Sequence, residues 1–164
     1  MKHQFLLLIA PLTFLASCVS SPMPVPEGYH GPLAQVRDTS SPVSSTKIQF
    51  FQLTKVDGRG VQASSVSTYM RNQGHGFSME PVLEVRDIPA RQCVLSIEGV
   101  THVAADILAF GGGMYRVEGD VTVALKPDKH YFVKGLLMKD YCAVWLEDAE
   151  GHVVSNKIEK GKKY

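Results

Sequence analysis

The side chains that could do chemistry here begin with three cysteines, Cys18, Cys93 and Cys142. Cysteine thiolates act as nucleophiles, as metal ligands and as disulfide partners. The three lie too far apart in the sequence for a CxxC redox pair or a cysteine-rich zinc site. Their use must therefore follow from the compartment in which the protein folds.

The histidines and glycines offer little further chemistry. The histidines beyond residue 17 never occur at the spacing of a helical metal site: His30, His75, His102, His130 and His152. The run 111–113 is Gly-Gly-Gly and lacks the Lys-Ser/Thr of a phosphate loop, and no GxSxG motif occurs. His75, flanked by glycines, would be accessible to a ligand. We predict a protein that is not an enzyme and that uses no cofactor or metal.

Residues 1–17 have the layout of a removable export signal that ends just before Cys18. Lys2 precedes an apolar run from Phe5 to Leu15. This run is shorter than the roughly 20 residues of a spanning helix, and Pro11 interrupts it. The segment Leu15-Ala16-Ser17-Cys18 resembles the lipobox of bacterial lipoproteins.

The resemblance implies that the Cys18 thiol receives a diacylglycerol, that the chain is cut before it and that the new amine is acylated. Three acyl chains hold a protein firmly on a membrane. Position 19 is Val and not the Asp of inner-membrane lipoproteins, which favours the outer membrane with the domain in the periplasm. The alternative is an ordinary secretory signal, since Ala16 and Cys18 are both small.

The chain divides into four parts. We expect the signal at 1–17, a lipidated flexible tether at 18–45, a single domain at 46–160 and a basic tail end at 161–164. The tether is rich in serine and has five prolines between residues 19 and 45. Removal of the signal takes away Lys2, which reduces the 17 basic residues to 16 and balances the 16 acidic ones. The mature chain then has a net charge of zero, so nucleic acid is not an expected partner. The lysines after residue 156 could touch envelope phosphates, although such a tail is usually only solvated.

The sequence of the domain predicts an all-β antiparallel sandwich. Short β-branched and aromatic runs alternate with turns such as Asp57-Gly58. Strands are predicted at 47–54, 61–70, 82–86, 93–100, 115–125, 131–138, 142–147 and 153–158. The stretch 103–110 could instead form a helical turn.

The pattern Leu125-x-Pro127-x-x-x-Tyr131 resembles the tyrosine corner of immunoglobulin-like and fibronectin type III sandwiches. It implies a Greek-key sandwich, immunoglobulin-like or transthyretin-like, in which the Tyr131 hydroxyl bonds to upstream backbone. With Cys18 lipidated, Cys93 and Cys142 remain as an even pair in an oxidising compartment. We predict a disulfide between them, the alternative being two buried thiols.

A buried Tyr131 sets the register of a hairpin closed by Lys139-Asp140. Leu137 then opposes Cys142, and Lys134 opposes Trp145. This register leaves an apolar group on the outer face, named here the hairpin patch: Phe132, Leu136, Met138, Tyr141 and Trp145. Such a group predicts a protein-binding surface. The alternative is that the tether, the segment near Ala104 or an additional strand covers it, with Lys134 lying over the Trp145 ring.

Three functions remain open from the sequence. The first is a structural or assembly lipoprotein that docks an envelope protein at the outer membrane, similar in plan to small lipidated β-sandwiches of secretion machines. The second is a binding module for an envelope ligand such as a glycan, peptidoglycan or a target enzyme. The third, a hydrolase, would need a polar cleft that the sequence does not reveal.

Overall fold

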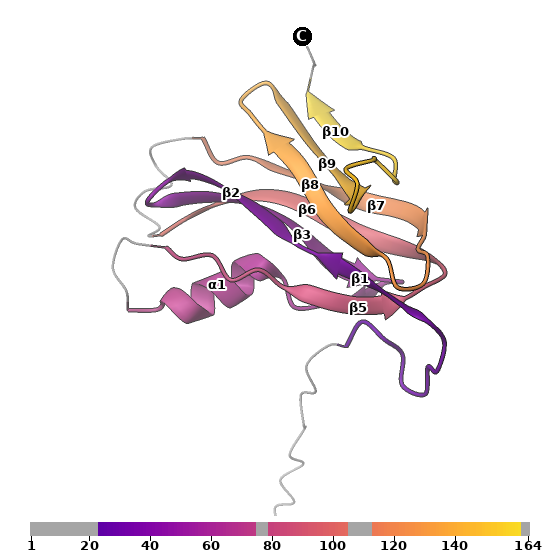
Figure 1. The fold of residues 1–164 in the computed structure, drawn as a ribbon. Coiled ribbons are helices and arrows are strands. Elements are labelled where there is room, and N and C mark those ends of the chain that lie inside the picture. Colours follow the sequence, from indigo (N-terminus) through magenta and orange to yellow (C-terminus); the bar gives the residue numbers. More distant parts are fainter. Residues whose placement is uncertain (1–22, 75–78, 105–112, 162–164) are drawn as a thin grey trace, which may run out of the picture.

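Two β-sheets packed face to face make up most of this protein (Figure 1). The computed structural model describes residues 23–74, 79–104 and 113–161. In chain order the elements are β1 (Leu33–Arg37), β2 (Thr39–Ser44), β3 (Lys47–Val56), β4 (Arg59–Gly60), α1 (Ser64–Asn72), β5 (Val85–Pro89), β6 (Gln92–Val103), β7 (Arg116–Ala124), β8 (His130–Leu137), β9 (Tyr141–Asp148) and β10 (Ile158–Gly161).

The first sheet has the order β10-β9-β8-β1-β5, and the second has β2-β3-β6-β7 with β4 paired to β3. The prediction of an all-β, sandwich-like domain is confirmed. The described strands pair antiparallel except that β1 runs parallel to β8. The first sheet is therefore mixed, with one parallel pair among antiparallel ones.

The core lies between the sheets. Alternate residues of each strand point inward, and both sheets contribute branched aliphatic side chains that are fully buried. Leu53 and Ile97 come from the second sheet, while Val133, Val144 and Leu146 come from the first. Burial of this apolar surface is the main force that holds the two layers together.

The β8–β9 hairpin confirms the predicted register. Leu137 lies opposite Cys142, and Lys134 opposite Trp145. Tyr131 is buried, and its hydroxyl accepts a hydrogen bond from the backbone N–H of Lys126 at 3.0 Å. The predicted contact of this tyrosine with upstream backbone is therefore present where the chain turns from β7 into β8.

The Asp57-Gly58 turn also agrees with the sequence. Both residues have positive φ, 48° and 77°, as a two-residue hairpin turn between β3 and β4 requires. Other strands are shifted at their ends. The segment 82–86 becomes β5 at Val85–Pro89, and 153–158 becomes an isolated bridge at Val153 followed by β10.

The predicted tether extends too far. Residues 33–44 form β1 and β2, one in each sheet, so the folded domain begins at Leu33 and not at residue 46. The serines and the proline of β2 are typical of a linker, so the sequence does not indicate a strand there. They are compatible with a strand because β2 lies at the edge of its sheet and pairs with β3. An edge strand tolerates Pro42, which has no N–H to donate.

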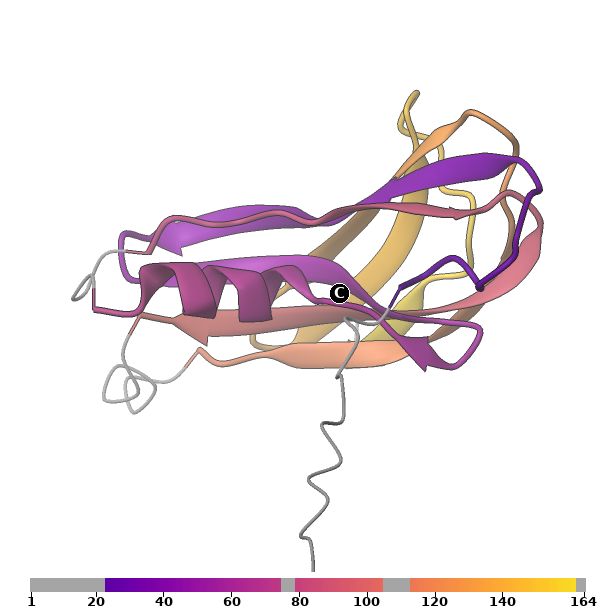
Figure 2. The ribbon, with the colours of Figure 1, turned by 90° about the horizontal axis from the view of Figure 1, so that it is seen from below.

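The predicted strand at 61–70 is wrong, because residues 64–72 form the helix α1. Figure 2 shows α1 running along the strands of a sheet. It packs on the outer face of the second sheet, since it bonds to Gln52 while the neighbouring Leu53 points into the core. The predicted helical turn at 103–110 falls mostly outside the described residues.

Candidate functional site

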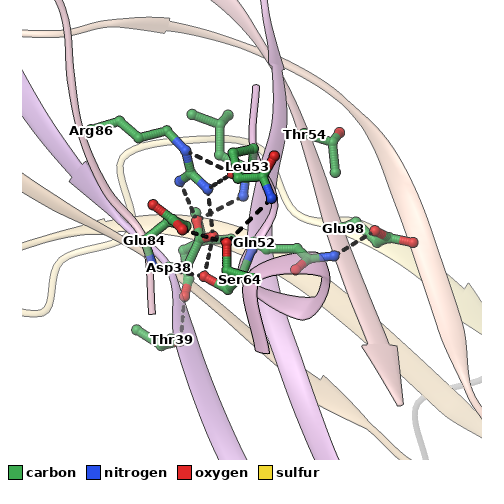
Figure 3. Close-up of polar contacts among 12 residues, drawn as sticks. Asp38, Thr39, Gln52, Leu53, Thr54, Ser64, Glu84, Arg86 and Glu98 are labelled. Carbon is green, nitrogen blue, oxygen red and sulfur yellow. Dashed lines mark hydrogen bonds and ion pairs between the residues drawn. The ribbon is translucent and has the colours of Figure 1, made fainter. Parts of the chain in front are cut away.

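A cluster of buried polar side chains joins α1 to both sheets, and Figure 3 shows it. Its centre is Asp38, the residue at which the chain leaves β1 and crosses to β2. The carboxylate receives two hydrogen bonds from the Arg86 guanidinium, at 2.8 and 2.9 Å. It also accepts from the Leu53 N–H at 2.9 Å and from the Ser64 hydroxyl at 2.6 Å. One carboxylate therefore connects β3, β5 and the start of α1.

A second part of the cluster lies beside the first. Gln52 donates to Glu98 at 2.9 Å and to the Ser65 hydroxyl at 3.0 Å, and accepts from the Ser65 N–H at 2.9 Å. Glu98 also pairs with Arg116 at 2.7 Å. Asp38, Gln52 and Ser64 are at most 1% exposed. These groups cannot exchange partners with solvent.

The cluster is closed as well as buried. Among the described residues, every buried side-chain nitrogen and oxygen has a hydrogen-bond partner. A catalytic acid, base or nucleophile must be accessible to its substrate, whereas the polar groups of this cluster are hydrogen-bonded to other protein groups. The cluster therefore serves to hold α1 in place.

Holding α1 by polar contacts turns its apolar side chains outward. The buried positions of the helix are Ser64, Ser65 and Thr68. Val66, Tyr69 and Met70 are 43%, 67% and 63% exposed, and their i, i+3, i+4 spacing puts them on one face. A surface helix normally buries such a stripe and exposes its hydroxyls. We name these three residues the α1 stripe.

A cavity of about 230 Å³ lies beside the α1 stripe. Tyr69 belongs to both, and the cavity continues to Met79 and to His102 near the end of β6. The His102 ring packs edge-on against Phe50, with ring centroids 5.8 Å apart. Burial lowers the pKa of His102, so the ring is neutral at pH 7. The volume is below that of most small-molecule sites and suits a single side chain or a small ligand.

The hairpin patch is only partly exposed. Tyr141 is buried, with its hydroxyl bonded to Glu159. Trp145 is half-buried beneath the ammonium group of Lys157, 4.3 Å from the ring centroid. The covering cation is therefore Lys157 of the segment before β10, and Lys134 lies over Phe132 instead. Leu136 and Met138 stay exposed near the turn.

The predicted disulfide is absent, because Cys93 and Cys142 are both free and buried. Cys142 lies opposite Leu137, whose side chain reaches Gly99 of β6. Gly99 is six residues along β6 from Cys93, which corresponds to roughly 20 Å of strand. The Cα atoms of a disulfide are usually less than about 7 Å apart. The disulfide inferred from the even number of remaining cysteines is therefore not formed.

Cys93 should resist alkylation in the folded protein. Burial, assisted by the nearby Asp57 carboxylate, raises the pKa of its thiol from 9.0 to about 11. At pH 8 the thiolate fraction falls about a hundredfold, and the rate should fall with it. Between pH 9 and 11 the folded state keeps a proton that the unfolded state loses, so stability should decrease as pH rises.

Iodoacetamide labelling followed by mass spectrometry measures this rate. Two free cysteines should become labelled in urea without any reductant. A disulfide-linked peptide, or native labelling of Cys93 as fast as in urea, would contradict the assignment. Labelling Cys142 in the same sample provides an internal comparison.

The remaining candidates contribute little. In the described part of the chain, no three His, Cys, Asp or Glu side chains are grouped so that they could hold a metal ion. No described helix has the length and apolar character needed to cross a membrane. The lipidation candidate Cys18, the histidine His75 and two glycines of 111–113 lie outside the described residues. Gly113, the last of that run, lies close to Lys47 of β3.

Comparisons with protein-family models, with curated proteins and with solved structures give no match to this chain. The residues and their geometry are therefore the basis for any assignment of function. Sequence periodicity missed the α1 stripe, although its i, i+3, i+4 spacing is visible between Val66 and Met70.

Proposed function

We propose that this protein is a non-enzymatic lipoprotein of the cell envelope that docks another envelope protein at the outer membrane. The export signal and the Leu15-Ala16-Ser17-Cys18 segment support lipid anchoring at Cys18. The bond between Lys126 and Tyr131 supports an immunoglobulin-like form of the sandwich. Fourteen residues, 19–32, separate Cys18 from the start of β1 and would link the domain to the anchor.

The observation that carries the docking proposal is the α1 stripe. Its three side chains are exposed because the hydroxyl face of the same helix is bonded to the sheet. Exposed tyrosine and methionine side chains are enriched at protein interfaces, where they bury a large apolar area. The cavity beside Tyr69 would receive one side chain of the partner.

The combined change Tyr69→Asp and Met70→Asp should strongly reduce partner capture and leave the fold intact. Both side chains are mostly exposed, so the melting temperature should change little, whereas capture should fall at least about tenfold. A photo-crosslinker at Val66 in intact cells, followed by mass spectrometry of adducts, measures capture.

The matched control is Leu136→Asp with Met138→Asp, which adds the same charge to the exposed remainder of the hairpin patch. If only the control variant reduced partner capture, the docking site would be the hairpin patch and not the α1 stripe. No adduct with any envelope protein from either surface would overturn the docking proposal.

The second candidate is an envelope ligand-binding module, which the cavity between α1 and His102 favours. The His102 ring there could bind a polar group of a glycan or peptidoglycan fragment. Such a ligand should shift the NMR signals of His102, and soluble peptidoglycan fragments that shift no signal would exclude this class.

A further inference from the structure

The strands at the edges of the two sheets differ in how well they could accept another strand. Prolines, bulges and short length all hinder strand addition at an edge. β2 contains Pro42, and its register with β3 shifts between Pro42 and Ser44. β5 has five residues and ends at Pro89, and β10 has four residues. These three edges are poor sites for strand addition.

The remaining edge strand, β7, has none of these obstacles. It has nine residues without proline, and its register with β6 runs without a shift. At its two ends the Thr101 N–H donates to the Tyr115 carbonyl and the Leu125 N–H to the Arg91 carbonyl. Odd-numbered residues of β7 therefore bond to β6, and even-numbered residues direct their N–H and C=O groups away from it. We name the even-numbered residues the β7 edge: Arg116, Glu118, Asp120, Thr122 and Ala124.

A cavity of about 370 Å³ opens beside the first residues of β7, between β7 and β10. Val117 and Ile158 supply its apolar lining. The Ile158 side chain lies over Gly119, since a Cβ built on this glycine would be 3.1 Å from it. A strand paired to β7 would direct alternate side chains to this inner side. The side chain opposite Val117 would enter the cavity and contact Ile158.

The charged groups around the β7 edge determine which kind of strand it suits. Arg116 is already paired with Glu98 and Glu118, each at 2.7 Å. Asp120 accepts a hydrogen bond from the Ser96 hydroxyl at 2.6 Å and forms no ion pair with another described residue. Along β7 and β10, with Glu98 included, the cations are Arg116 and Lys160, and the carboxylates are Glu98, Glu118, Asp120 and Glu159. The excess of carboxylates favours a strand with basic side chains.

The same carboxylates make a second copy of this chain a poor occupant. Antiparallel pairing of two β7 strands about Asp120 would place this residue opposite its own copy. Pairing about Gly119 would place Glu118 opposite Asp120, and pairing about Glu118 would place that residue opposite its own copy. Like charges directly opposite each other destabilise a strand pair. Charge therefore favours a basic strand over self-association.

We propose that the β7 edge binds an extended basic segment of another protein, which adds to the second sheet as a strand beside β7. The backbone of this segment bonds to the outward N–H and C=O groups of the β7 edge. A lysine or arginine of the segment faces Asp120, and a branched apolar side chain enters the cavity beside Ile158. The surface is distinct from the α1 stripe, because α1 bonds to β3, which β6 separates from β7.

Amide hydrogen exchange followed by NMR tests the proposal on the chain from Val19 onward, which holds every described element. The probe is a short blocked peptide that alternates lysine with valine. Without it the amides of Glu118, Asp120 and Thr122 should exchange quickly, because they face away from β6. Saturation with the peptide should slow their exchange at least about tenfold. The same peptide with glutamate in place of lysine should have a much smaller effect.

Two substitutions separate backbone pairing from charge. Thr122→Pro removes an N–H that β6 does not use, so the fold should be retained and peptide binding should weaken at least about fivefold. Asp120→Lys should weaken binding of the lysine peptide by about fivefold and favour the glutamate peptide.

The matched control is Asp87→Lys, which makes the same charge change on the exposed face of the edge strand β5. Equal loss of binding in Asp87→Lys and Asp120→Lys would mean that net charge decides, and would overturn the proposal. It would also be overturned if neither peptide slowed exchange at the β7 edge, or if both slowed it equally. None of these results bears on partner capture through α1.

Discussion

Replacing Asp38 with Ala should lower the free energy of unfolding by about 3–5 kcal/mol, the usual cost of breaking a buried ion pair. The change leaves the Arg86 guanidinium buried without its carboxylate. It also removes the acceptor for the Leu53 N–H and the Ser64 hydroxyl, so β3 and α1 lose their common attachment. Urea denaturation followed by circular dichroism measures the loss.

The control for this experiment is Asp87→Ala, an exposed aspartate next to Arg86 on β5. Its effect should stay within about 0.5 kcal/mol. The double variant Asp38→Ala with Arg86→Met should be more stable than Asp38→Ala alone, because no buried charge is left unpaired. A loss below about 1 kcal/mol for Asp38→Ala would show that the cluster does not hold the fold.

Replacing Gly135 with Ala should destabilise the protein by about 3 kcal/mol, since it overfills a closed part of the core. A Cβ on Gly135 would lie 2.3 Å from the Phe51 ring and 2.6 Å from the carbonyl oxygen of Ala143. The ring could turn aside, but the carbonyl belongs to the β8–β9 ladder and cannot. Thermal and urea unfolding measure the effect.

Gly60→Ala is the matched control, because nothing lies within 4 Å of a Cβ built there. It should leave stability nearly unchanged. Adding Phe51→Leu to Gly135→Ala should recover only part of the loss, because the contact with the Ala143 carbonyl remains. Full recovery would assign the cost to the ring alone, and equal effects of the two glycine substitutions would refute the close approach.

Strand alternation predicted those parts of the fold in which one face is apolar. The β8–β9 hairpin is the clearest case, since a buried Tyr131 and a two-residue period give the pairing of Lys134 with Trp145. The core strands β3 and β6 are found within a few residues of their predicted ends. In these segments local preference and tertiary packing agree.

The helix could not be found in this way, because its buried face consists of hydroxyls. Ser64, Ser65 and Thr68 are buried only because Asp38, Gln52 and Val82 supply their partners from elsewhere in the chain. A periodicity based on apolar residues takes Val66 and Tyr69 as core positions and reverses the two faces. The α1 stripe follows from tertiary hydrogen bonds that no local pattern contains.

The cysteine pairing was wrong for a related reason. The compartment and an even number of thiols say that a disulfide is chemically allowed, but not that the two sulfurs meet. Cys93 and Cys142 point into the same core near different ends of it. The hairpin patch was also predicted without knowledge of Lys157, which reaches Trp145 only because β10 pairs with β9.

The position of β1 has a mechanical consequence. This strand is the first of the fold, yet it lies inside its sheet with β5 on one side and β8 on the other. A force applied to the N-terminal segment would act along β1 and load the hydrogen bonds to both neighbours at once, in shear. Strands peeled from an edge lose their bonds one after another, whereas these would have to fail together. The domain would therefore resist being pulled open from the end that the tether occupies.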